Sequence, residues 1–146
     1  MSNDAKITVA KHLRLTHDGA LAIIEAAATK AAAMGVPQCI AVVDDGGNLL
    51  AFLRMDGSKF LSIDSALRKA ITAVSGRAPT GNVPGDIDMK LALATSGKLV
   101  NLKGGVPIVV DRMVIGGVGV GSGTGDQDLE VAKAGLAAIA GAIGTL

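Results

Sequence analysis

The sequence predicts an α+β fold in which helices pack on a single antiparallel sheet. Two strand pairs, each with a short turn, occupy residues 38–56 and 106–121, and segments of helical character flank them. The order is helix, hairpin, two helices, hairpin, helix, which favours an antiparallel sheet over a parallel one. The chain has 146 residues, of which 49% are apolar, so we expect one domain, residues 1–146, with a substantial core.

The first predicted helix has clear boundary signals. Thr16 is suited to cap its N-terminus, and Asp18 complements the helix dipole in the first turn. Gly35, followed by Pro37, is expected to end it. Three further helices are predicted over residues 62–76, 87–96 and about 126–142.

The predicted strands are apolar on both of their faces. In the second hairpin, Ile108 and Val110 lie on one face and Val109 on the other. An antiparallel sheet with one solvated face alternates more cleanly, so we expect the second face to be covered. We expect another subunit to cover it, and the alternative is a helix on each face. The hairpin should turn at Asp111-Arg112, through a wider or bulged turn, because a two-residue turn prefers Gly at the second position.

Composition and charge argue against several classes of partner. The net charge is +1 and no block of like charge occurs, so neither nucleic acid nor a membrane is an expected partner. The N-terminus has no apolar signal-peptide core and the single Cys39 forms no internal disulfide, so we expect a cytoplasmic protein. Only Phe52 and Phe60 are aromatic, which leaves almost no ring surface for stacking a flat ligand.

Glycines are concentrated in residues 104–125, but they do not form a nucleotide-binding motif. Neither the dinucleotide fingerprint nor the phosphate-binding P-loop pattern occurs in any register. One interpretation is that the glycines allow a helix or a second subunit to approach closely. The other is that the loop Gly121–Gly125 offers backbone N–H groups at a helix N-terminus to an anion. Asp126 and Asp128 suit that helix end, and with no His or Cys nearby we predict no metal site.

The two histidines do not form a zinc motif. His12 and His17 are five residues apart, whereas zinc-binding pairs on a helix are usually four apart. A role at the surface or at the start of the helix is favoured for them. His17 is the better candidate for an axial haem ligand.

Residues 54–72 contain a pattern suited to binding a carboxylate. Arg54 and Asp56 fall at a strand end, where functional residues are frequent. Ser65, Lys69 and Thr72 share one face of the following helix by their spacing. A cation beside two hydroxyls can hold a carboxylate, and the alternative interpretation is a solvated stripe.

Four segments together resemble the HbpS/GlcG-like family, which includes the C-terminal domain of PduO-type proteins. They are AVVDDGGNLLAFLRMDG, SALRKAITA, GGVPIVV and VIGGVGVGSGTGDQDLEVAKAGLAAI, in the family's order and over most of the chain. The resemblance implies a five-stranded antiparallel sheet with helices, profilin-like, assembled into homo-oligomers. The sequence departs from the family at Arg112, where Gly is commoner, and in having no signal peptide, which weakens the expectation of a secreted haem sensor.

The residues and the resemblance together support three hypotheses about function. The first is a cofactor-free enzyme, or binding protein, for a small oxo- or hydroxy-carboxylic acid, in a cleft near a subunit interface. Its ligand-binding residues would be Arg54, Lys69, Thr72, Gly104, Gly105, Pro107 and Gly121. Its catalytic residues would be Asp44, Arg54, Asp56, Lys69 and Asp128, with one of the aspartates as base. The alternative is a haem-binding or haem-degrading protein of the HbpS type with His17 as ligand, and the last is a non-catalytic oligomerising module.

Overall fold

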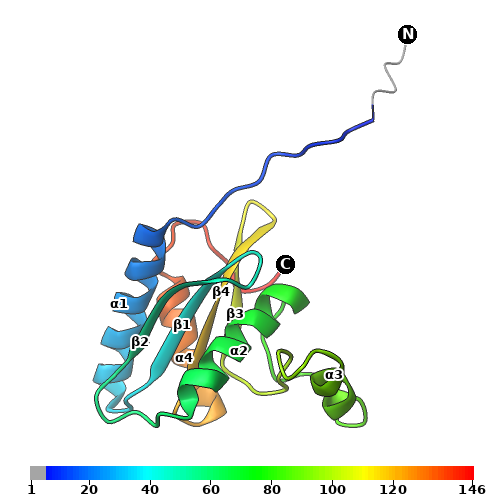
Figure 1. The fold of residues 1–146 in the computed structure, drawn as a ribbon. Helices are drawn as coiled ribbons and strands as arrows, with labels where there is room; N and C mark the ends of the chain where they lie inside the picture. The colour runs from blue at the N-terminus through cyan, green and yellow to red at the C-terminus, as the bar shows by residue number, and fades with distance from the viewer. Residues whose placement is uncertain (1–5) are drawn as a thin grey trace.

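The computed structural model describes residues 6–146, and the first part of the N-terminal segment, residues 1–5, lies outside the described residues. The elements confirm the predicted order (Figure 1). They are α1 (His17–Met34), β1 (Cys39–Asp44), β2 (Leu49–Arg54), α2 (Ser62–Gly76), α3 (Asp88–Ala94), β3 (Gly105–Val110), β4 (Met113–Gly121) and α4 (Gly125–Leu136). The last helix is shorter than predicted, because beyond Leu136 i→i−3 hydrogen bonds of turns replace the helical ones.

The two boundary signals predicted for α1 are confirmed, and α4 has a capping box that was not predicted. The Thr16 hydroxyl accepts a hydrogen bond from the Gly19 N–H at 3.1 Å, and Gly35 ends α1 in the left-handed conformation. The N-terminus of α4 carries a capping box, in which Thr124 and Gln127 exchange side-chain-to-backbone hydrogen bonds. These contacts fix where both helices begin.

The sheet contains four strands in the order β2-β1-β4-β3, and every neighbouring pair is antiparallel. The five strands implied by the resemblance are therefore a wrong prediction for residues 6–146. The chain after α4 does reach the outer edge of β3, but it forms only one bridge there, between Val109 and Ile143. Gly141, two residues earlier, is in a left-handed conformation (φ 76°), so extended backbone does not continue on that side of the bridge.

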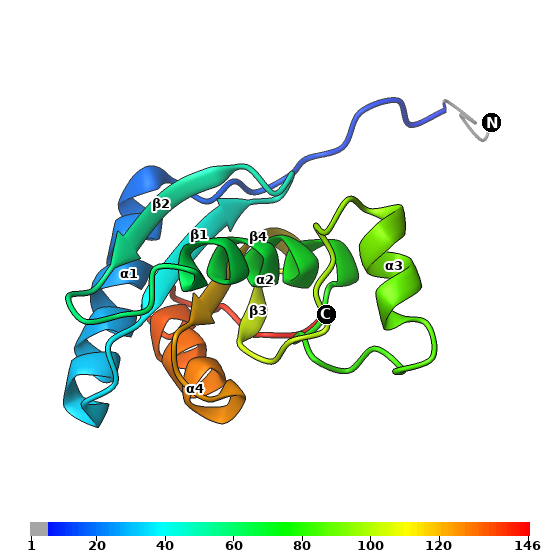
Figure 2. The same cartoon turned by 60° about the horizontal axis from the view of Figure 1, so that its bottom comes forward.

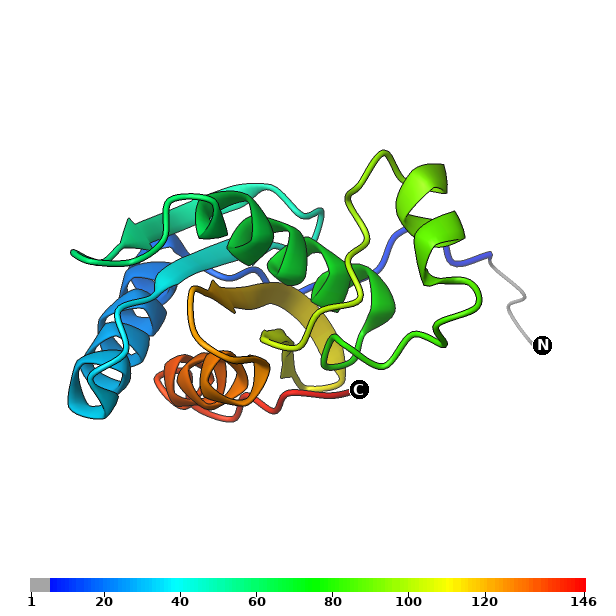
Figure 3. The same cartoon turned by 90° about the horizontal axis from the view of Figure 1, so that it is seen from below.

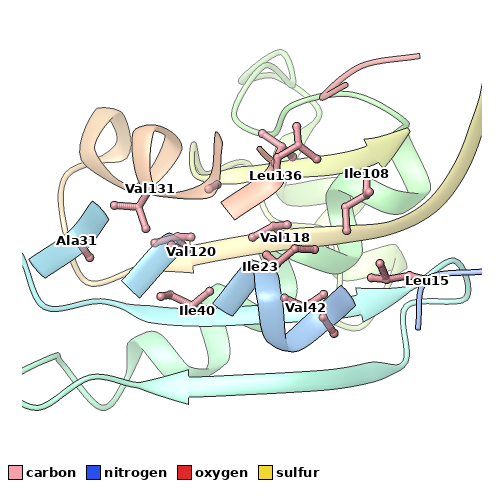
Figure 4. Packing of buried hydrophobic residues seen from close by; sticks show 14 of the residues in the cluster. Leu15, Ile23, Ala31, Ile40, Val42, Ile108, Val118, Val120, Val131 and Leu136 are labelled. Atoms are coloured by element: carbon pink, nitrogen blue, oxygen red, sulfur yellow. The ribbon is translucent and has the colours of Figure 1, made fainter. Parts of the chain in front are cut away.

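One face of the sheet is covered by α1 and α4 and holds the larger part of the core (Figure 4). Aliphatic side chains from both helices meet those of the central strands. The fully buried members include Ile23, Ile40, Val42, Val106, Ile108, Val118, Val120 and Val131. Burying such a side chain stabilises the fold by about 1.5–3 kcal/mol, so these aliphatic residues replace the missing aromatic ones as the source of stability.

The other face is covered by α2, which lies on the opposite side of the sheet from α1 and α4 (Figures 2 and 3). Its backbone runs directly over glycines of β3 and β4. A Cβ on Gly117 would stand 2.7 Å from the Ala70 carbonyl oxygen, and a Cβ on Gly119 would collide with the Ala66 carbonyl oxygen. The prediction that another subunit covers this face is therefore wrong in this structure, and the alternative, a helix on each face, holds. Most of the glycine run serves close helix packing.

Helix α3 stands apart from these layers. It contains no buried residue and lies beyond the C-terminal end of α2 (Figure 2). Within residues 6–146, no helix has both the length and the hydropathy needed to cross a membrane.

Candidate functional site

Four of the predicted site residues meet at the start of β3. The Lys69 ammonium is buried and donates hydrogen bonds to the Asp128 carboxylate at 2.9 Å and to the Val120 carbonyl at 2.8 Å. Gly104 passes beside this pair, and Gly105 packs against the backbone of Lys69. The other carboxylate oxygen of Asp128 accepts from the Gly123 N–H. Lys69 is thus neither a solvated stripe nor a free cation, because its charge is already matched by a buried carboxylate.

Other predicted site residues lie elsewhere. Arg54 and Asp56 stand at the end of the edge strand β2, which β1 and β4 separate from β3. They line a separate cavity of about 510 Å³ against α1. The Thr72 hydroxyl donates to the Lys98 carbonyl and accepts from the Val100 N–H, so it anchors the chain that follows α3.

The remaining predicted site residues, Pro107, Gly121 and Asp44, have structural roles in the sheet and its turns. Pro107 pairs with Gly117 inside the sheet, and Gly121 packs against the start of α2. Asp44 accepts hydrogen bonds from the Gly46 and Asn48 N–H groups in the β1–β2 turn. Burial alone would raise the pKa of Asp44, but these hydrogen bonds outweigh it and hold the pKa below its usual value. The predicted residues therefore do not form one shared pocket.

The N-terminus of α4 is occupied by the chain's own groups. The capping box and Asp128 use N–H groups that a bound anion would otherwise contact. Lys103 donates a hydrogen bond to Asp126 at 2.7 Å, and this bond lowers the pKa of the Asp126 carboxyl. The loop before α4 is therefore a poor anion site, because two carboxylates already stand there.

A different cavity combines cationic and apolar groups. It has a volume of about 590 Å³ and lies between the β1–β2 turn, the C-terminal half of α2, the β3–β4 turn and the end of the chain. We call it the turn cavity. Its apolar wall includes Ile71, Val74 and Val114, and its charged groups are His12, Asp45, Arg77 and Arg112. Three of these four charged or ionisable groups are basic, so the cavity suits an anionic ligand with a large apolar body.

Both arginines of the turn cavity adopt backbone conformations that favour glycine. Arg77 follows α2 at φ 57°, and Arg112 occupies the second position of the two-residue β3–β4 turn at φ 63°. The expected wider turn is therefore wrong, because Asp111 also adopts a positive φ of 49° and the strands pair directly on either side. The irregularity occurs farther along the ladder, between Ile108 and Val109.

His12 belongs to the segment before α1 and was predicted to have a role at the surface or at the start of the helix. Its Nε2 lies 3.1 Å from an Asp45 carboxylate oxygen, and both side chains are about half exposed. A carboxylate bonded to one ring nitrogen fixes the orientation of the imidazole and leaves the other nitrogen for a ligand. No pattern in the sequence indicated this pair, because Asp45 comes from a turn 33 residues away.

His17, the predicted haem ligand, lies in a less suitable environment. It is the first residue of α1, its side chain is 80% exposed, and its Nε2 is 3.5 Å from Asp18. It lines a cavity of about 450 Å³ together with Asp18, Asp44, Asp45 and one cation, Arg14. Three carboxylates in this cavity would oppose the binding of an anionic ligand. Within residues 6–146, no three His, Cys, Asp or Glu side chains are grouped closely enough to hold a metal ion.

Comparisons with known proteins identify the family. Residues 15–137 match the family described as haem degrading protein HbpS-like. The chain is 42% identical to Protein GlcG of Escherichia coli strain K12 over 107 residues, which cover 73% of this chain and 80% of GlcG. The structure is similar to that of a PduOC–haem complex, with a TM-score of 0.84 and 27% identity, over 92% of this chain and 100% of the other. It is also similar to a double mutant of Streptomyces reticuli HbpS, with a TM-score of 0.81 and 34% identity, over 95% and 96% of the two chains. The chain therefore belongs to the HbpS-like family.

Proposed function

We propose that this protein binds haem in the turn cavity, with His12 as the axial ligand and with Arg77 and Arg112 as partners of the two propionate groups. The observation on which the proposal depends is that two arginines, both at strained backbone positions, line one cavity together with an imidazole. The similarity to a protein crystallised with haem supports it. The proposal replaces His17 with His12 as the expected ligand.

The strained backbone is an argument for function. A non-glycine residue in the left-handed region costs of order 1 kcal/mol or more, and such residues cluster at functional sites. Arg77 and Arg112 are 35 residues apart in the sequence, yet both line the turn cavity. Glycine would relieve each position, so the presence of arginine indicates a use for its charge.

The chemical groups of the turn cavity fit haem. Haem is a large apolar ring with two carboxylates on one edge, and the turn cavity joins an aliphatic wall to two guanidinium groups. The planar guanidinium of arginine can form two parallel hydrogen bonds with a carboxylate. It is also more weakly hydrated than an ammonium, so it loses less when it leaves water for the cavity. A volume of about 590 Å³ lies within the usual range of about 300–1,000 Å³ for ligand pockets. Bound haem would supply an iron whose axial ligand and surroundings select oxygen binding, oxygen activation or electron transfer.

The alternative of a cofactor-free enzyme acting on a small acid has weaker support. Its proposed cation, Lys69, is held by Asp128, and Arg54 lies across the sheet. The comparisons favour haem, since the related structures include a haem complex and the family is described by haem degradation.

Haem titration followed by the Soret absorbance tests the proposal. The chain has no Trp or Tyr, so its own near-ultraviolet absorbance will not obscure the spectrum of the complex. We expect His12→Ala to weaken haem binding by about tenfold or more and to shift the Soret band, because the iron loses its ligand. His17→Ala is the matched control and should bind as the wild type does. Loss of binding in His17→Ala with none in His12→Ala would place the haem beside α1 and refute the assignment.

We also propose that the protein forms a homo-oligomer. An uncovered sheet face cannot be the reason for assembly, because α2 covers the second face of the sheet. Large apolar side chains nevertheless remain exposed within residues 6–146, among them Phe60 (69%), Leu61 (73%), Met89 (68%) and Leu93 (76%). Phe60 and Leu61 lie just before α2, and Met89 and Leu93 lie one turn apart on α3. Exposed apolar pairs of this kind are candidates for subunit interfaces.

A further inference from the structure

A second cavity lies beside the C-terminal half of α2, between this helix and the segments 78–83 and 95–99. Its volume is about 430 Å³, and it is enclosed by α2, by the loop 78–83 and by residues 95–99. We call it the loop cavity. It shares Ile71 and Ser75 with the turn cavity, so α2 forms the wall between the two.

The surface of the loop cavity is mostly apolar, although Thr72, Ser75, Thr80, Asn82 and Thr95 also line it. Ile71, Pro79, Val83 and Leu99 contribute apolar side chains, and no aromatic ring or imidazole lies among the lining residues. Unlike the turn cavity, this cavity therefore offers no nitrogen ligand for iron. An aliphatic chain suits these walls better than haem does.

The threonine hydroxyls of the lining are already engaged by the protein. Thr72 donates to the Lys98 carbonyl, Thr80 donates to the Leu102 carbonyl, and Thr95 donates to the Leu91 carbonyl. The Thr72 bond ties α2 to the segment 95–99, and the Thr80 bond ties the loop 78–83 to Leu102, just after that segment. Apart from these threonines and Lys98, the polar side chains of the lining are Ser75 and Asn82. A small number of polar groups that set the ligand's orientation is usual in small-molecule pockets.

Lys98 supplies the single charge of the lining. Within residues 6–146 it takes part in no ion pair, unlike Lys30, Lys69 and Lys103. One ammonium in the lining of a mostly apolar cavity is complementary to a ligand with one negative charge and an apolar tail. A dianion would lack a second cation among the lining residues.

We propose that the loop cavity binds a small aliphatic monocarboxylate, with its hydrocarbon chain inside and its carboxylate at Lys98. This site is separate from the turn cavity, and its ligand class does not depend on haem binding. The observations that support it are the mostly apolar surface, the engaged threonine hydroxyls and Lys98, the one cation of the lining, which has no ion-pair partner within residues 6–146.

Isothermal titration calorimetry with hexanoate, octanoate and decanoate at low ionic strength tests the proposal. We expect binding to tighten about fourfold for each added methylene, which corresponds to about 0.8 kcal/mol of buried apolar surface. Lys98→Met keeps the side-chain length and removes the charge, so it should weaken octanoate binding about five- to tenfold. Lys90→Met is the matched control, since Lys90 lies on α3 outside the lining, and it should change the affinity less than twofold.

Two further variants locate the bound ligand. Val83→Trp should fill the loop cavity and abolish binding, with circular dichroism confirming that the fold persists. Arg112→Met, in the turn cavity, should leave octanoate binding unchanged. The proposal is overturned if wild type binds none of the three acids below millimolar concentration, or if Lys98→Met and Lys90→Met bind equally. It is likewise overturned if Arg112→Met weakens octanoate binding more than Lys98→Met does.

Discussion

Replacement of Arg112 by glycine should make the protein more stable while weakening its hold on haem. Arg112 sits at φ 63° in a two-residue turn. An L-residue in this region costs about 1–2 kcal/mol, whereas glycine enters it freely. Glycine also loses about 0.5–1 kcal/mol more backbone entropy on folding. We therefore expect Arg112→Gly to raise the free energy of unfolding by about 0.5–1 kcal/mol, which corresponds to a rise in Tm of about 2–4 °C for a chain of this length.

The same substitution removes one proposed propionate partner. Arg112 is exposed in the structure, so the lost ion pair is worth about 0.5–1 kcal/mol, in the range of solvent-exposed pairs. Haem affinity should fall about two- to fivefold, and more at low ionic strength, where screening is weaker. Urea unfolding followed by far-ultraviolet circular dichroism gives the stability, and Soret titration gives the affinity.

The control is Asp111→Gly, one residue earlier in the same turn. Asp111 also has a positive φ, 49°, but it does not line the turn cavity. The free energy of unfolding of Asp111→Gly should rise by up to about 0.5 kcal/mol only, because Asp tolerates this conformation better than Arg does. Its haem affinity should not change. Equal haem affinities for Arg112→Gly and Asp111→Gly would refute the assignment of Arg112 to a propionate.

Four further predictions concern the fold, acid stability and assembly. Gly119→Ala should destabilise by about 3 kcal/mol in urea unfolding because it forces the α2 backbone off the sheet, whereas Gly76→Ala, with open space around it, should be neutral or stabilising. Lys69→Met should cost about 3–5 kcal/mol by leaving a buried carboxylate unpaired, and replacing that carboxylate as well should recover much of the loss. Asp44 has a lowered pKa, so its stabilising effect is complete above about pH 4 and is lost as the pH falls through its folded value; Asp44→Ala should therefore be more destabilising at pH 7 than at pH 3. Light scattering should give a mass above that of a monomer at micromolar concentration, and Phe60→Asp should lower it if the exposed apolar surface is the interface.

The sequence by itself determined the local structure of this protein. The order of helices and hairpins, the N-cap at Thr16 and the helix stop at Gly35 were all predictable. Each depends on groups within about four residues of one another, such as a hydroxyl and the N–H three positions later. The family was also recognisable, because its motifs are contiguous in the chain.

Tertiary structure alone decided how these elements meet. From the sequence, the glycines of β4 fit both a ligand-binding loop and a packing surface. The contacts of the α2 backbone with Gly117 and Gly119 show that they are a packing surface. Lys69 gained its partner Asp128 from 59 positions away. His12, Arg77 and Arg112 line one cavity because both hairpin turns and the end of α2 lie at the same end of the sheet. Such contacts depend on the packing of distant segments, which hydrophobic periodicity and capping signals do not specify.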